Sequence, residues 1–191
     1  VDTGSTDRTK EIAGKYADKV LDFAWCDDFS AARNFSLREA SNNWIFMIDC
    51  GETIKEIDID ELNYFRKNLP DKVGSVSREN IVTQNGIRTL NNIDYTERFF
   101  NKKRYRYTGI IHEQLTPVSG KEISALLLQT TLLHTGYDMT KVERQAKYSR
   151  NFTLLEKQLQ QDPQNPYLYY QLGKSCEILE DFARARVYYD K

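Results

Sequence analysis

The sequence predicts an α/β fold in which a mixed sheet is followed by paired helices. Strand and helix patterns alternate in the first part of the 191-residue chain, which is typical of a doubly wound sheet with parallel strands. Strand patterns then follow one another through residues 81–134, so antiparallel strands should extend the sheet. From Lys141 onward the pattern is helical only. We place two domains at residues 1–138 and 139–191.

The first elements are indicated by turn residues, capping residues and one apolar run. A turn at residues 4–7 should lead into the first helix, and residues 19–23 form a short strand candidate. Ser30 is expected to cap a second helix. Residues 44–48 are all apolar and end abruptly at Asp49, which predicts a strand buried on both faces.

The middle of the chain carries a hairpin signal. Asn85-Gly86 lies between the strand-like residues 81–83 and 87–90, and both turn residues tolerate positive φ angles. Three further strands are expected, at residues 98–100, 104–108 and 126–134. These strands make the predicted sheet mixed rather than purely parallel.

The C-terminal helices have the residue spacing of a tetratricopeptide repeat. Residues 142–161 contain neither Gly nor Pro, a second helix is expected at 166–179, and a third near Asp181. The repeat pattern is carried by Tyr169, Leu172, Gly173, Cys176, Ala185 and Tyr189. Because Gly173 is small, a large residue can fill the space beside it, and the paired helices can pack closely.

Composition limits the class of protein. Hydrophobic residues make up 40% and charged residues 29% of the chain, as in soluble globular proteins, and the net charge of −1 argues against nucleic acid as a partner. Cys26, Cys50 and Cys176 match neither a zinc site nor a redox pair, as expected for reduced thiols in the cytosol. No stretch approaches the ~18 apolar residues of a membrane span. We expect a cytoplasmic location, including a peripheral one at the inner face of the membrane.

Two early segments place polar side chains where doubly wound sheets bind their ligands. Asp2 lies at a strand end, before a Gly and a capped helix, which makes a nucleotide-binding corner where it can accept a hydrogen bond from a base. Ser5 and Asp7 in the same turn are interpreted as helix caps. Arg33 lies early in the second helix, where it can contact a base or a diphosphate, or else point into solvent.

A third segment follows the apolar run at residues 44–48. That strand delivers Asp49 and Glu52 to the end of the sheet. Hard divalent cations prefer oxygen ligands, and a diphosphate leaving group needs its charge neutralised. The alternative is a strand-end turn with solvated carboxylates.

In this order and spacing, the three segments resemble the family 2 glycosyltransferases, whose pattern is a D-x-G-S-x-D turn, an A-R-N helix start and a strand that ends in D-x-D. The likeness continues at residues 97–100, 107–115 and 133–137, which are similar to an arginine-aromatic strand, a G-x-x-H-E motif and a later histidine motif of one branch. That branch includes lipooligosaccharide glucosyltransferases and sublancin-type peptide S-glycosyltransferases, some with tetratricopeptide-like helices. The resemblance implies a Rossmann-like GT-A fold whose first strand is missing, with roughly 30 residues expected before Val1.

The resemblance also implies an activity, the inverting transfer of a sugar from a nucleotide-diphosphate donor to an acceptor hydroxyl or thiol. Asp2 would lie near the base and Arg33 near the base or the diphosphate. A general base must lie within hydrogen-bond reach of the acceptor, and Glu113 is the first candidate and Asp94 the second. His112 has a structural interpretation, in which it braces the loop of Glu113.

A divalent cation, Mn or Mg, is implied in the same way. Asp49 would face the ribose or the metal, and Glu52 and His134 would complete the metal ligands. For His134 a purely structural role is the open alternative. Gly51 stands at the second acidic position of D-x-D, so the longer side chain of Glu52 is left to reach the metal.

The expected partners are a nucleotide-sugar donor and a glycan, lipid-linked or peptide acceptor, as in cell-surface glycan biosynthesis, with a protein partner on the helical repeats. The basic residues 102–106 suit a diphosphate or an anionic acceptor, and alternatively form a solvated hairpin. A second class of function is a degenerate, non-catalytic module that binds a sugar nucleotide or a peptide. A third is a nucleotidyltransferase, which would need a Gly-rich basic phosphate loop that the visible sequence lacks.

Overall fold

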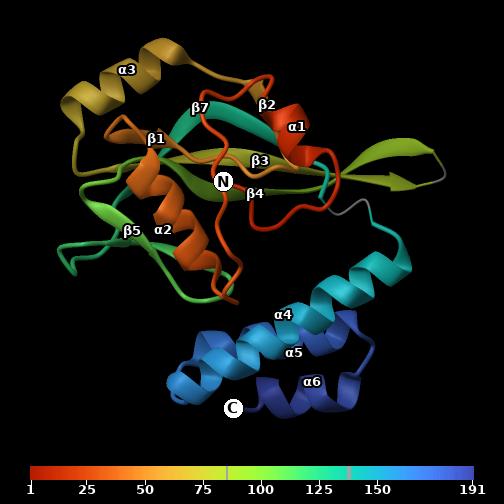
Figure 1. Cartoon of the computed structure of the whole chain (residues 1–191). Coiled ribbons are helices and arrows are strands. Elements are labelled where there is room, and N and C mark those ends of the chain that lie inside the picture. The colour runs from red at the N-terminus through yellow and green to blue at the C-terminus, as the bar shows by residue number, and fades with distance from the viewer. Residues whose placement is uncertain (85, 137–138) are drawn as a thin grey trace. The chain divides into compact units, whose positions relative to one another are not determined.

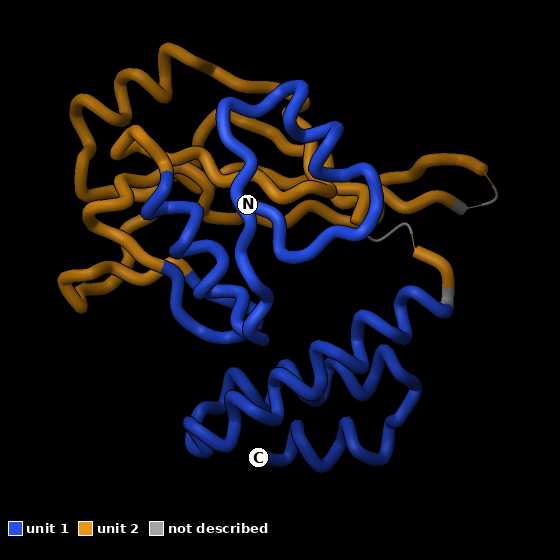
Figure 2. The backbone as a smooth tube through the Cα atoms, viewed as in Figure 1, with its two compact units in different colours: residues 1–39, 107–114, 141–191 blue, residues 40–106, 115–140 orange. Residues whose placement is uncertain are grey.

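The structure is a computed structural model that describes residues 1–84, 86–136 and 139–191 (Figure 1). Internal contacts divide the chain into two compact units (Figure 2). Unit 1 comprises residues 1–39, 107–114 and 141–191, and unit 2 comprises residues 40–106 and 115–140. Each unit is described by itself. The domains expected at 1–138 and 139–191 stay a prediction, because contact units and domains are different divisions of a chain.

Unit 2 is built on a five-stranded mixed sheet. Its strands are β1 (Trp44–Phe46), β2 (Glu52–Glu56), β3 (Val73–Gln84), β4 (Ile87–Asn101) and β7 (Ala125–His134). Their order is β1-β4-β3-β7-β2, with β3 and β7 parallel and the other neighbours antiparallel. A separate two-stranded sheet pairs β5 (Tyr105–Thr108) with β6 (Gln114–Pro117). The predicted mixed α/β fold is therefore confirmed.

The core of unit 2 lies between this sheet and α3 (Ile59–Asn68). Phe65 of α3 packs against Val76 and Leu132 on neighbouring strands, and both of these aliphatic side chains are fully buried. Asp58 caps α3, because its carboxylate accepts a hydrogen bond from Glu61 N at 2.9 Å. Burial of the apolar face of α3 holds it on the sheet, since an isolated helix of this length is marginal in water.

The predicted hairpin is confirmed, and its strands are longer than expected. β3 and β4 pair from Gly74↔Phe99 to Gln84↔Ile87, and Gly86 has a φ of 76°. Asn85 lies outside the described residues. The strands expected at 98–100 and 126–134 are confirmed within β4 and β7, and the one expected at 104–108 is confirmed as β5, which begins one residue later, at Tyr105.

Two strand predictions from the first part of the chain are corrected. The run at 44–48 gives only the short strand β1, which is half-buried and pairs antiparallel with β4. Residues 19–23 give a single parallel bridge, Asp2↔Asp22, rather than a strand. Among the described residues the parallel pairings are this bridge and β3–β7. The prediction for residues 44–48 was wrong because an apolar run indicates burial but does not identify the partner strand.

The N-terminal part of unit 1 contains α1 (Thr9–Ala13) and α2 (Phe29–Glu39). The expectation that Ser30 caps the second helix is wrong. Asp28 does so, since its Oδ1 accepts hydrogen bonds from Ala31 N at 2.9 Å and Ser30 Oγ at 2.8 Å. A carboxylate at this position also complements the helix dipole.

The remaining helices of unit 1 are α4 (Lys141–Gln161), α5 (Pro166–Ile178) and α6 (Phe182–Tyr189), and all three were predicted. Asn165 and Asp181 cap α5 and α6. Their shared core contains Ile111, Phe152, Leu154, Leu155, Leu168, Leu172, Cys176 and Ala185. Ile111 comes from the segment at 107–114, so this core includes more than the helices.

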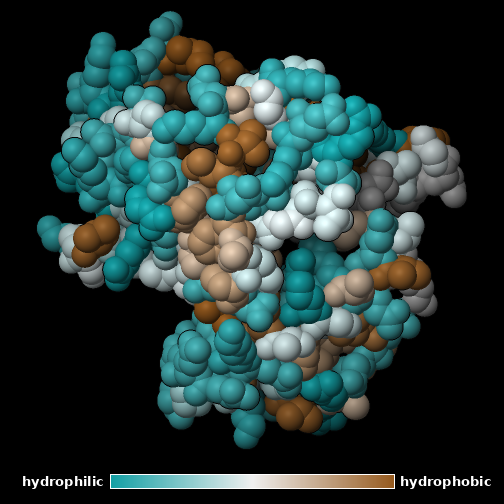
Figure 3. Space-filling view, viewed as in Figure 1, coloured by the Kyte–Doolittle hydropathy of each residue, from teal (hydrophilic) through white to brown (hydrophobic). Residues whose placement is uncertain are grey.

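None of the helices formed by the described residues combines the length and apolar character that crossing a bilayer requires. Hydrophilic residues predominate on the face shown in Figure 3, where apolar residues appear in small separate groups. Scattered exposed apolar residues are ordinary on a protein surface.

The close packing predicted at Gly173 can be tested by a double-mutant cycle. A Cβ at Gly173 would collide with the ring of Tyr189. Ala has a helix propensity about 1 kcal/mol more favourable than Gly, so Gly173→Ala should stabilise the fold by about that amount only when Tyr189→Ala removes the ring. In the wild-type background the collision should cancel or reverse this gain. Urea unfolding measures both free energies.

The control for this cycle is Lys157→Ala, at an exposed position of α4. Its effect should be the same in both backgrounds. Equal effects of Gly173→Ala with and without the Tyr189 ring would contradict the packing interpretation.

Candidate functional site

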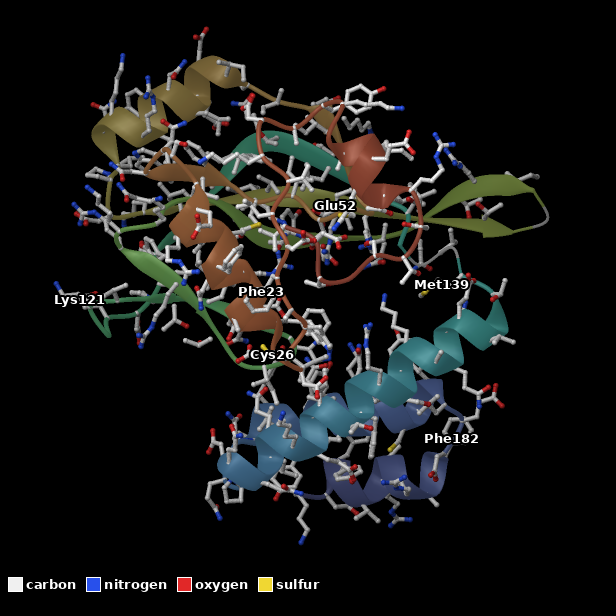
Figure 4. All side chains as sticks on the ribbon, viewed as in Figure 1. Phe23, Cys26, Glu52, Lys121, Met139 and Phe182 are labelled. Atoms are coloured by element: carbon white, nitrogen blue, oxygen red, sulfur yellow. The ribbon has the colours of Figure 1, made fainter. Side chains whose placement is uncertain are left out.

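The candidate side chains form two groups, one in each unit. Unit 1 holds Asp2, Arg33 and Glu113, and unit 2 holds Asp49, Glu52, Asp94 and His134. Figure 4 shows Glu52 among the strands of unit 2.

Asp2 closes its own turn. Its Oδ2 accepts hydrogen bonds from Gly4 N at 3.0 Å and Ser5 N at 2.9 Å, and its Oδ1 accepts one from Ser5 Oγ. The bond from the Ser5 hydroxyl is the main reason why the pKa of Asp2 is lowered. Asp7 accepts a hydrogen bond from Thr9 N at 2.9 Å, but the N-cap residue of α1 is Arg8, so Asp7 is not the cap that was predicted. Ser5 instead bonds to Asp2, so its predicted capping role is wrong.

Arg33 and Glu113 form an ion pair, in which Arg33 Nε donates to Glu113 Oε1. Only 22% of the Arg33 side chain and 11% of the Glu113 side chain are exposed. The guanidinium also lies 5.2 Å from the ring centroid of Tyr107. The contact of Arg33 with a base or diphosphate stays a prediction.

Asn34 holds the same segment by two further hydrogen bonds. Its Nδ2 donates to Tyr107 O and its Oδ1 accepts from Tyr107 N, both at 2.9 Å. A side-chain amide thus pairs with the backbone of Tyr107 as a neighbouring strand would. The A-R-N motif and the G-x-x-H-E motif, distant in sequence, are therefore in direct contact.

The loop that carries Glu113 has an unusual backbone. Gly109 has a φ of 95° and His112 a φ of 50°, and positive φ is uncommon for residues other than Gly. Gln158 of α4 accepts hydrogen bonds from the amides of Ile110 at 3.1 Å and Ile111 at 3.4 Å. The sequence analysis missed Gln158, because one glutamine on a long polar helix has no distinguishing pattern. The bracing role suggested for His112 stays a prediction.

In unit 2 the centre of the site is Glu52, whose side chain has no exposed surface. Its Oε1 accepts from Arg98 Nη2 at 2.5 Å and Arg78 Nη1 at 3.2 Å, and its Oε2 accepts from Asp49 N at 2.9 Å. Arg98 Nη2 also donates to Asp49 Oδ2 at 3.0 Å. Two cations thus compensate the buried charge of Glu52.

The same network extends to Asp94. Arg78 donates from Nε and Nη2 to the two oxygens of Asp94, at 2.8 and 2.9 Å, and Arg78 and Asp94 are cross-strand partners. Burial opposes ionisation of Asp94, but the hydrogen bonds from Arg78 and Asn80 outweigh it, and its pKa is lowered. Burial likewise opposes the charge on Arg78, whose pKa is nevertheless raised by Asp94 and Glu52.

The tautomer of His134 follows from its neighbours. Asn80 Nδ2 donates to Asp94 at 3.0 Å, so Asn80 Oδ1 faces His134 Nδ1 at 2.8 Å. A carbonyl oxygen only accepts hydrogen bonds, so Nδ1 carries a proton, and in the neutral form of the ring the lone pair is on Nε2. This is how the outer partners of a metal-binding histidine orient it.

The predicted metal ligands fit a cation unequally. Within residues 1–84, 86–136 and 139–191, no three His, Cys, Asp or Glu side chains gather as a metal site. Glu52 is committed to Arg98, Arg78 and the Asp49 amide, so its carboxylate does not fit a metal ligand. Asp49, with 37% of its side chain exposed, and His134, through Nε2, have suitable chemistry.

Two of the basic residues at 102–106 bind other residues of unit 2. Lys102 Nζ donates to Ala40 O at 2.5 Å, and Arg104 forms an ion pair with Asp71. These contacts give both side chains a structural role in the turn between β4 and β5.

Comparisons with known proteins agree with this arrangement. Residues 1–116 match the family model described as Glycosyl transferase family 2. A TPR repeat-containing protein of Synechococcus elongatus is 30% identical over 189 residues, which cover 91% of this chain and 44% of that protein. The SPbeta prophage-derived glycosyltransferase SunS of Bacillus subtilis and the glycosyltransferase SunS of Bacillus phage SPbeta are each 25% identical over 202 residues.

The two glycosyltransferase alignments cover 100% of this chain and 45% of each relative. The chain therefore spans less than half the length of the curated relatives named above. The family match includes the Asp2 turn, the A-R-N helix start, the turn at Asp49 and the loop of Glu113. Helices with the predicted repeat spacing follow it, in keeping with the TPR-containing relative. This chain belongs to glycosyl transferase family 2.

Proposed function

We propose that this chain carries catalytic residues of a glycosyltransferase, which moves a sugar from a nucleotide-diphosphate donor to an acceptor hydroxyl or thiol with inversion. The observation that carries the proposal is the family 2 match over residues 1–116. It is supported by the ion pair between Arg33 and Glu113, two motif residues inside that range. A largely buried carboxylate held by a guanidinium suits a positioned catalytic group.

Glu113 is the general base in this proposal. As the acceptor oxygen or sulfur attacks the anomeric carbon, Glu113 takes its proton, and the bond from that carbon to the diphosphate breaks on the opposite face. Arg33 and the bound loop fix the direction of the carboxylate. Asp94 is the weaker candidate, because Arg78 covers both of its oxygens and its pKa is lowered.

Donor binding is assigned to Asp2, Arg33 and Asp49. The turn of Asp2 is closed by hydrogen bonds from the backbone of Gly4 and Ser5 to its carboxylate. A turn of this kind provides a surface for a base. Arg33 would contact the base or the diphosphate, and Asp49 the ribose.

A divalent cation, Mn or Mg, completes the proposal, with Asp49 and His134 as the residues that would hold it. When bound, it would neutralise charge on the leaving diphosphate. Glu52 has a different role, since it holds the arginines that orient Asp49 and Asp94. The proposed acceptor is a glycan, a lipid-linked sugar or a peptide, at a cytoplasmic location.

The alternative is a module that binds a sugar nucleotide or a peptide without transferring sugar. It is favoured by Gly51, which replaces the second carboxylate of D-x-D, and by the ion pairs that occupy Glu52. In that case the helical repeats would recruit a protein or peptide partner. Donor binding without turnover distinguishes this alternative from the enzyme.

Replacement of the proposed base should separate binding from chemistry. Glu113→Gln should lower transfer by roughly 10²–10⁴-fold, the contribution of a general base, and leave donor affinity within a few-fold. Nucleotide release from UDP- and GDP-sugars with Mn, measured on the full-length protein, reports transfer, and calorimetry reports binding. Glu122→Gln, at an exposed position, is the control and should have no effect.

Two results would contradict this assignment. Unchanged transfer by Glu113→Gln would remove Glu113 from the role of base. A wild-type protein that binds a donor and never releases its nucleotide would favour the binding module.

Glu52 should behave as a structural residue and Asp49 as a ligand. Glu52→Gln removes the buried anion that Arg98 and Arg78 share and leaves them only Asp49 and Asp94, and the loss should be about 3–5 kcal/mol of unfolding free energy, with or without Mn. Asp49→Asn should keep most of the stability and lose the rise in melting temperature that Mn produces in the wild type.

Thermal unfolding with and without Mn measures both effects. Glu56→Gln, on the exposed end of β2, is the matched control. A stable Glu52→Gln protein that no longer responds to Mn would make Glu52 a metal ligand after all.

A further inference from the structure

We propose that Gln158 of α4 is a positioning residue for Glu113. It would act by fixing the backbone of the loop at residues 109–113, without contact with the reacting atoms. This inference rests on the proposed role of Glu113 as the base. It gives the helical segment a part in the chemistry of the family 2 domain.

The first argument is the hydrogen bonding of the loop. A single atom, Gln158 Oε1, accepts from Ile110 N and from Ile111 N, at 3.1 and 3.4 Å. A Cβ at Gly109 would lie 3.5 Å from Gln158 Nε2, so the whole amide lies against the loop. Backbone amides that lose a buried partner cost about 1–3 kcal/mol each. Without Gln158, the present conformation of the loop would lose these two hydrogen bonds and become less stable relative to others.

The second argument is the burial of the loop. Ile111 is 3% exposed and belongs to the core formed with Phe152, Leu155 and Leu172. The polar contact of Gln158 and the apolar contact of Ile111 therefore act on adjacent residues. Both come from the helical segment.

The third argument is that the loop is also bound from α2. Phe29 N donates to Ile110 O at 2.9 Å, Asn34 pairs with the backbone of Tyr107, and Arg33 binds Glu113. The carboxylate of Glu113 thus has its side chain fixed by α2 and its preceding backbone fixed by α4. A catalytic group misplaced by about 1 Å can lose roughly 100-fold in rate.

Three variants test the proposal on the full-length protein. Gln158→Leu keeps the size and removes the acceptor, Gln158→Glu keeps an acceptor oxygen, and Gln160→Leu changes an exposed glutamine of the same helix. Gln158→Leu should lower kcat about 10- to 100-fold and leave the KM for the donor unchanged. Gln158→Glu should recover most of kcat, and Gln160→Leu should match the wild type.

Hydrogen exchange gives a readout that does not depend on activity. The amides of Ile110 and Ile111 should exchange faster in Gln158→Leu and stay protected in Gln158→Glu. If Gln158→Leu does not fold, Gln158→Asn, which withdraws the same amide by one methylene, takes its place with the same expectations.

The outcomes separate the inference from the proposed function. Unchanged exchange, or faster exchange with an unchanged kcat, overturns the positioning role of Gln158 and leaves Glu113 as the base. Equal losses in Gln158→Leu and Gln158→Glu also overturn it. A wild-type protein without transfer overturns both, because no base would remain to be positioned.

Discussion

The polar centre of unit 2 depends on one buried carboxylate, that of Glu52. An isolated charge without solvent exposure is prohibitively costly, so its two arginine partners are obligatory. Arg98 then holds Asp49, and Arg78 holds Asp94, which fixes Asn80 and through it the tautomer of His134. The orientations of Asp49, Asp94 and His134 are therefore linked to the buried carboxylate of Glu52 through this chain of hydrogen bonds.

Unit 1 shows a comparable dependence of one motif on another. Arg33 and Asn34 are neighbours in sequence, and each binds the segment at 107–114 in its own way, through charge and through backbone pairing. The helix α4 adds Gln158 to the same segment. A loop with positive φ at Gly109 and His112 has little intrinsic preference for its conformation. Its shape therefore depends on these contacts, together with the burial of Ile111 and the hydrogen bond from Phe29 N to Ile110 O.

The sequence predicted those features that local chemistry decides. The Asn85-Gly86 hairpin, the three C-terminal helices and the repeat spacing around Gly173 follow from turn propensity, capping and helical periodicity. The sequence-based prediction failed where the structure of a residue depends on a partner that is distant in the chain. The run at 44–48 does not reveal that β1 pairs antiparallel with β4, and Glu52 looks like a solvated turn residue until Arg78 and Arg98 are brought beside it. Gln158 could not be found for the same reason.

The identity of residue 51 connects the geometry with the question of the metal. A Cβ at Gly51 would be in ordinary contact with the His134 ring, 3.6 Å from Cδ2, and with the backbone of Gly136, also at 3.6 Å. Glycine supplies no charge at this position. Glu52, the next acid, cannot supply it, because its burial is what holds Arg78 and Arg98 in place. The carboxylates of Asp49, Glu52 and Asp94 together carry one formal negative charge more than the guanidiniums of Arg78 and Arg98 carry positive. In the proposed transfer, Gly51 removes one carboxylate from the metal site, and leaving-group stabilisation would draw more on arginine than in a site with both acids of D-x-D.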